Sequence, residues 1–137
     1  MSTLPESRPR KVARGLLAAA FAIAGVAHLT RPGGFVAITP HWVPAPETVV
    51  ALTGGAELAG AAGLLIPRLR TAAGIGLALY ALCVWPANIN HALADIPLGG
   101  THLSWWYHGP RLALQPVIIW WALWASGATN WPMTRKR

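Results

Sequence analysis

The sequence is poor in charge: only 11% of its 137 residues are Asp, Glu, Lys or Arg, whereas about 25% is usual in soluble domains. This shortage, beside 54% hydrophobic residues, argues against a soluble globular protein. There is one cysteine, Cys83, which excludes an intrachain disulfide and a dithiol redox pair. Because it lies in an apolar run, we expect it to be a small buried apolar residue. Segments of alternating apolar and polar residues are also lacking, which argues against a membrane β-barrel.

Four long apolar segments are present instead. Each approaches the ~20 residues that an α-helix needs to cross a bilayer core of ~30 Å. They cover about residues 12–29, 49–66, 71–93 and 112–128. The short link of residues 67–70 makes the second and third segments antiparallel neighbours. The sequence therefore predicts an all-α fold, a single domain over residues 1–137 that forms a four-helix transmembrane bundle.

Basic residues lie at the ends of these segments, which is typical of topology signals and not of a nucleic-acid surface. Only Arg31 and Arg111 fall on one side of the predicted membrane. The positive-inside rule then places both termini in the cytoplasm. A cleaved signal peptide is the alternative interpretation of the first segment, and it would leave three spans. The basic residues on the cytoplasmic side are Arg8, Arg10, Lys11, Arg14, Arg68, Arg70, Arg135, Lys136 and Arg137.

Glu57 is the only charged residue in the second apolar segment, Val49 to Ile66. A carboxylate at this depth costs on the order of 2.5–3.5 kcal/mol by insertion scales, so it should face protein or water. We therefore predict a functional site around it. The alternative is a buried carboxyl that stays protonated or pairs with Arg111 or a histidine.

Other polar residues gather in the outer half of the predicted bundle, and the inner half has no comparable group. We expect an outward-open funnel with Glu57 at its floor. Glu57 and His28 are its candidate catalytic residues. The candidate ligand-binding residues are Trp42, Trp85, Asn88, His91, Arg111 and Gln115. Taken singly, the histidines and Arg111 are equally compatible with ordinary interfacial residues, and Asn88 with a hydrogen bond between helices.

The sequence also gives expectations for the two outer loops and for the glycines of the helices. The proline-rich loop of residues 30–48 cannot form a long helix. The second outer loop, residues 95–110, contains the aromatic run Trp105-Trp106-Tyr107. Small residues permit close helix approach, and we expect this at Gly25, Gly54, Gly60, Gly63, Gly74 and Gly76.

Several stretches together resemble the DoxX-like small membrane proteins of the MauE/DoxX group. They are AGVAHLTRPGGF with ITPHWVPAP, GGAELAGAAGLLIPRLR, WPANINHAL and RLALQP. The resemblance covers most of the chain in the expected order and implies a four-helix bundle in a bacterial inner membrane. It also implies a redox association, because better-characterised members include thiosulfate:quinone oxidoreductase subunits. Many members have no established activity, so whether this chain is an enzyme stays open.

Three functions follow as hypotheses. The first is a redox-associated subunit that binds a quinone-like lipophile beside Glu57 and works with a redox partner protein, with Arg111 holding an anion. The second is a non-catalytic accessory or scaffold protein that uses the aromatic loop as its contact. The third is a lipophile-binding, isomerase-like protein with Glu57 as general acid or base. Haem between His28 and His91 is a weaker candidate, and no metal site or nucleic-acid partner is expected.

Overall fold

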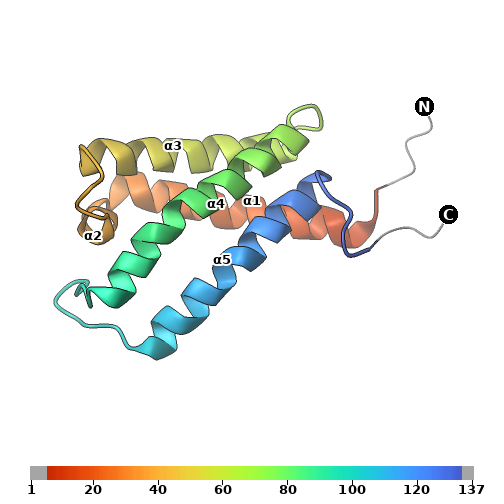
Figure 1. The fold of residues 1–137 in the computed structure, drawn as a ribbon. Helices are drawn as coiled ribbons and strands as arrows, with labels where there is room; N and C mark the ends of the chain where they lie inside the picture. Colours follow the sequence, from red (N-terminus) through yellow and green to blue (C-terminus); the bar gives the residue numbers. More distant parts are fainter. Residues whose placement is uncertain (1–5, 134–137) are drawn as a thin grey trace.

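The computed structural model describes residues 6–133, and helices account for most of them. Five α-helices follow one another along the chain (Figure 1). The described residues form no β-strand, only an isolated bridge between Leu98 and Thr101. The helices are α1 (Arg8–Thr30), α2 (Gly33–Ile38), α3 (Pro46–Leu65), α4 (Arg70–Leu93) and α5 (Trp105–Ser126). The predicted all-α class is confirmed.

The four long helices pack in two close pairs, α1 with α3 and α4 with α5, and α3 also contacts α4 across the tight link between them. The α3–α4 link lies at the same end of the bundle as the start of α1 and the end of α5 (Figure 1). The short helix α2 and the α4–α5 loop lie at the opposite end, here called the α2 end. This is the pairing of ends that the charge pattern predicted. Arg135, Lys136 and Arg137, also used in that prediction, lie outside the described residues.

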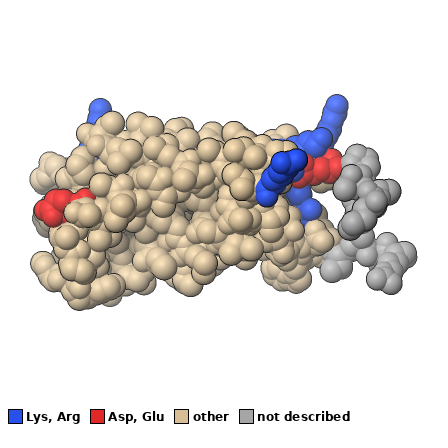
Figure 2. Space-filling view, turned by 90° about the horizontal axis from the view of Figure 1, so that it is seen from above, with Lys and Arg blue, Asp and Glu red and all other residues tan. Residues whose placement is uncertain are grey.

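Three helices, α1, α3 and α4, are long and apolar enough to cross a membrane. The fourth predicted span, α5, has 22 residues and is not one of these three; Arg111, Gln115 and two prolines lie within it. On the face seen in Figure 2, Lys and Arg atoms lie at the two ends of the bundle and the stretch between them carries no charged atom. Three of the described helices could therefore span a membrane, which indicates membrane association.

The boundaries of α5 differ from the sequence prediction. The helix begins at Trp105, seven residues before the predicted start, so Trp105-Trp106-Tyr107 form its first turn instead of a loop. Pro110 and Pro116 both lie inside the helix. Proline is a weak stop signal in such a segment, because neighbouring helices can satisfy the freed carbonyls. The end of α5 follows the usual rule, with Gly127 at φ 83° directly after Ser126.

Glycines set the closest helix approaches, as predicted. A Cβ added at Gly54 would lie 2.8 Å from the Cβ of His28 and 3.1 Å from the carbonyl oxygen of Gly25, so α1 and α3 touch backbone to backbone there. Gly60, Gly63 and Gly74 are equally crowded by neighbouring helices. The prediction is wrong for Gly76, which has no neighbour within 4 Å and faces outward.

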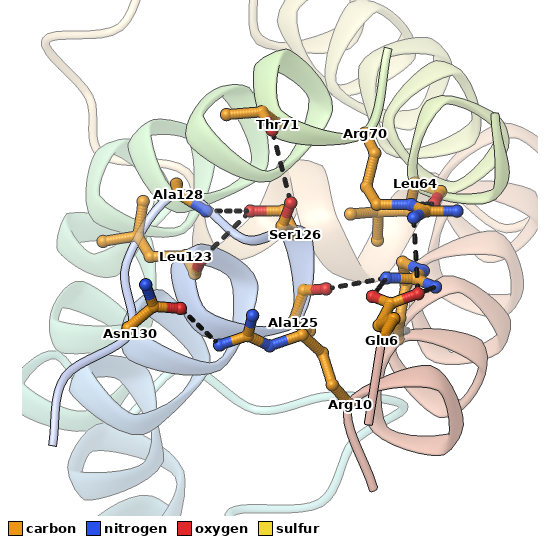
Figure 3. A network of polar contacts seen from close by, with 11 residues as sticks. Glu6, Arg10, Leu64, Arg70, Thr71, Leu123, Ala125, Ser126, Ala128 and Asn130 are labelled. Atoms are coloured by element: carbon orange, nitrogen blue, oxygen red, sulfur yellow. Dashed lines mark hydrogen bonds and ion pairs between the residues drawn. The ribbon is translucent and has the colours of Figure 1, made fainter. Parts of the chain in front are cut away.

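A polar network at the end opposite α2 corrects the expectation that this half has no comparable polar group (Figure 3). Arg14 is only 5% exposed; its guanidinium forms an ion pair with Glu6 and donates to the carbonyl oxygen of Ala125, 3.1 Å away. Nη1 of Arg70 lies 3.4 Å from Oε2 of Glu6. The hydrogen bond from Arg14 lowers the pKa of Glu6, although partial burial opposes the shift. The network therefore adds stability at neutral pH and loses it only as pH falls through that lowered pKa.

Candidate ligand cavity

A cavity of about 480 Å³ lies between α1, α3, α4 and α5. Residues of α2 and of the loop that follows it line its α2 end, among them Phe35, Pro40 and Trp42. Most of its walls are aliphatic and aromatic side chains. Small-molecule sites usually measure ~300–1,000 Å³ and combine apolar walls with a few polar groups, so this cavity has the size and character of a ligand site.

Glu57 lines the cavity and is 3% exposed. One carboxyl oxygen, Oε1, accepts a 2.8 Å hydrogen bond from the hydroxyl of Tyr80 on α4. The other, Oε2, has no hydrogen-bond partner among the described residues. A buried polar atom without a partner is costly, which makes Oε2 the natural contact for a bound molecule or a water.

His28 stands beside Glu57 because α1 and α3 meet so closely at Gly25 and Gly54. Its Nδ1 lies 2.9 Å from Glu57 Oε2 and also 2.9 Å from the carbonyl oxygen of Ala24. One N–H cannot donate well to both, and the angles favour the Ala24 carbonyl, one turn back on the same helix. The ring also stacks on Phe35 of α2, with centroids 3.7 Å apart. His28 therefore contacts both the Glu57 carboxyl and Phe35 of α2, at the α2 end of the cavity.

Asn88 and Gln115 also line the cavity, as predicted. The side-chain amide of Gln115 donates a 2.6 Å hydrogen bond to the Ala81 carbonyl of α4 and ties α5 to α4. Ala81 immediately follows Tyr80, so this bond lies at the depth of the carboxyl. Asn90 was not predicted; its amide donates to the Ile38 carbonyl at 3.0 Å and anchors the end of α2.

Arg111 lines the cavity, but the predicted ligand residue His91 does not. His91 is fully buried behind Arg111, whose Nη1 lies 2.9 Å from its Nδ1. The other side of the His91 ring meets the buried ring of His108, with centroids 4.7 Å apart. His91 thus supports Arg111 and is not itself in contact with the cavity.

Of the two tryptophans predicted to bind the ligand, one lines the cavity and the other does not. Trp42 lines the cavity from the loop after α2, whereas Trp85 is not one of its walls. Cys83, expected to be buried, is exposed on α4 at the edge of the cavity. Within residues 6–133 no three His, Cys, Asp or Glu side chains lie close enough together to hold a metal ion. His28 and His91, the candidate haem ligands, have different surroundings, one inside the cavity and one behind Arg111.

Tyr80 is the main site residue that the sequence prediction missed. A phenol in the middle of an apolar helix was a usable signal, because a buried tyrosine hydroxyl normally finds a hydrogen-bond partner. Pairing of Glu57 with a histidine was one of the predicted alternatives, and it occurs with His28. The sequence does not indicate which histidine takes part, since this depends on the spacing of two helices. The alternative pairing of Glu57 with Arg111 does not occur.

Comparison with known proteins identifies a family without assigning an activity. No curated protein and no solved structure matches the chain. One family model, described as a domain of unknown function (DUF8561), matches residues 17–126. This range contains α2, α3, α4 and α5, most of α1, and every residue that lines the cavity. The chain belongs to the DUF8561 family.

Proposed function

We propose that this protein is a multi-pass membrane protein that binds a quinone-like lipophile in the cavity beside Glu57. The observation that carries the proposal is Glu57 itself, a 3% exposed carboxyl in an apolar cavity. Its Oε2 forms no hydrogen bond of good geometry with a described residue, although His28 Nδ1 lies 2.9 Å away. A quinone has a flat apolar body and carbonyl oxygens. Such a molecule would fill the space between the aromatic and aliphatic walls, and one of its carbonyl oxygens would accept a hydrogen bond from Glu57 in its protonated form.

In the proposed orientation α5 is the fourth span and both ends of the chain face the cytoplasm of a bacterium. The support is the gathering of basic residues such as Arg10, Arg14 and Arg70 at one end of the bundle. The end of the cavity that α2 and its following loop line then lies toward the outer face of the inner membrane. We include the DoxX-like, redox-associated role in the proposal because of the sequence resemblance.

The proposed role of Glu57 is to exchange a proton with the bound molecule. Reduction of a quinone to a quinol takes two electrons and two protons, and Glu57 with Tyr80 at 2.8 Å supplies a hydrogen-bonded route for a proton. The electrons would come from a redox partner protein, because a chain with a single cysteine has no dithiol pair of its own.

Filling the cavity tests the proposal. Ala24 on α1 lines the cavity, so Ala24→Phe should occupy the space and weaken binding of a short-chain naphthoquinone by at least about tenfold. Binding is measured by quenching of the fluorescence of Trp42 and Trp121, which also line the cavity. Ala19→Phe on the exposed side of the same helix is the control and should bind as the natural protein does. Equal binding by both folded variants would refute the cavity as the site.

A second candidate function is general acid–base chemistry on a lipophile, as in an isomerase. The arrangement that favours it is a carboxyl flanked by a tyrosine hydroxyl and an imidazole, both at hydrogen-bond distance. A proton shift within a bound substrate needs no electron donor, so turnover by the purified protein without a redox partner distinguishes it from the first proposal.

The accessory or scaffold function is supported by a different feature, the exposed aromatic turn at the start of α5. Trp106 is 91% exposed and Trp105 beside it is also exposed. Here replacement of these tryptophans, and not of Glu57, should abolish the contact with a partner protein.

A further inference from the structure

We infer that the ligand is an amphiphile with an anionic head group, which Arg111 holds where the main cavity meets a second cavity between α4 and α5. The inference rests on the proposed function, since it names the class of molecule that occupies the same site. It is carried by the surroundings of Arg111 and by the walls that the two cavities share.

Arg111 is a half-buried cation surrounded by neutral groups. Its Nη1 lies 2.9 Å from Nδ1 of His91, so the imidazole nitrogen must accept and the ring is neutral at this nitrogen. Its guanidinium carbon lies 5.5 Å from the centre of the Tyr107 ring. Neither contact supplies a negative charge, and a cation removed from water normally has an anion beside it.

The four acidic residues of the chain are all described, and none of them contacts Arg111. Glu6 belongs to the network at the opposite end of the bundle. Glu57 lies beside Tyr80 and His28, and Asp95 lies 2.9 Å from His102. Glu47, in the first turn of α3, forms no ion pair with a described residue. None of the acidic side chains of the chain therefore serves as the counter-ion of Arg111.

The position of Arg111 indicates where the anionic head group of the ligand would lie. A second cavity of about 430 Å³ lies between α4 and α5, and Asn88, Arg111, Gln115 and Ile118 line both cavities. These four side chains therefore form a common wall between the two spaces.

The remaining walls of the second cavity include Trp106 and Leu114, both of which are exposed on the outside of the bundle. In a bilayer these side chains would face lipid, and Trp and Tyr at this end favour the head-group level. A molecule that enters here arrives from the membrane with its head group beside Arg111 and its quinone-like body, which carries the carbonyl, directed toward Glu57. Guanidinium binds carboxylate and phosphate strongly by paired hydrogen bonds, which accounts for an arginine at this point.

The test compares a doxyl-labelled stearic acid with its methyl ester in phosphatidylcholine nanodiscs, at an alkaline pH where the acid is ionised. The nitroxide quenches tryptophan fluorescence, so binding is read from the protein itself. We expect the natural protein to bind the acid about tenfold or more tightly than the ester. Arg111→Gln should lose this preference, because its affinity for the acid should fall to that for the ester. Arg31→Gln, which removes an exposed cation from the α2 end, should keep the preference.

Each result has a defined meaning. Equal binding of acid and ester by the natural protein, or an unchanged preference in Arg111→Gln, overturns the anionic head group and leaves the proposed cavity standing. Failure of both probes to bind overturns this inference, whereas the proposed function is decided separately by binding of the naphthoquinone. Inorganic phosphate is added as a competitor; if it displaces the acid at micromolar concentration, the anion is a separate soluble ligand and the amphiphile is refuted.

Discussion

Glu57→Leu is expected to abolish the preference of the cavity for a quinone over a hydrocarbon of the same shape, a loss of about tenfold or more in relative affinity. The carboxyl contributes Oε2, which forms no hydrogen bond of good geometry with a described residue. In its protonated form it donates to a ligand carbonyl, and such a hydrogen bond is worth roughly 0.5–1.5 kcal/mol. Leucine fills a similar volume but offers no polar contact. The measurement is a pair of titrations, with a naphthoquinone and with methylnaphthalene.

Glu57→Gln is the matched variant for this prediction. It keeps the shape of the side chain and a hydrogen-bond donor, so the preference for the carbonyl ligand should persist. It cannot transfer a proton, so turnover would be lost if the acid–base role is real. A folded Glu57→Leu protein that still prefers the quinone would show that the carboxyl does not contact the ligand.

Gly74→Ala should destabilise the pairing of α4 with α5 enough to lower the melting temperature of the protein. A Cβ at this position would coincide with the side chain of Ser126 and lie 2.7 Å from the carbonyl oxygen of Ala122. The Ala122 carbonyl belongs to the backbone of α5 and cannot rotate away, so the two helices must separate. Overpacking of this kind typically costs about 1–3 kcal/mol, which exceeds the gain of up to ~1 kcal/mol that alanine brings to a helix.

Gly76→Ala provides the control for that substitution. It lies two residues further along α4 and has nothing within 4 Å, so only the gain in helix propensity remains and stability should be unchanged or higher. Thermal unfolding of the two variants in the same detergent makes the comparison. Equal melting temperatures would mean that α4 and α5 are not in contact at Gly74.

Much of the fold could be predicted from the sequence because apolar length is a strong signal. Four segments, the tight turn after α3 and the shared end of the bundle all follow from hydropathy and charge. The start of α5 could not be predicted in this way, because Gly109, Pro110 and Pro116 are turn signals in water and tolerated in a helix packed against its neighbour. Hydropathy also cannot distinguish a protein core from lipid, which explains the wrong expectation that Cys83 is buried.

The candidate site could be predicted only in part. The depth of Glu57 in an apolar segment was sufficient to identify it, whatever it contacts. Whether His91 lines the cavity was harder to predict, because His91 lies three residues from Asn88 and therefore only ~60° away from it around the helix. That small rotation separates a side chain that lines the cavity from one that lies behind Arg111. Which of the two side chains faces the cavity depends on how α4 packs against its neighbours, and the sequence of α4 alone does not specify that packing.

Native mass spectrometry of the purified protein tests the central claim, that a lipophile occupies the space around the Glu57 carboxyl. The natural chain and Ala19→Phe should each carry one small apolar molecule that is released on activation, and Ala24→Phe should not. A natural chain that carries no such molecule after gentle extraction, or an equal load in Ala24→Phe, would contradict the account.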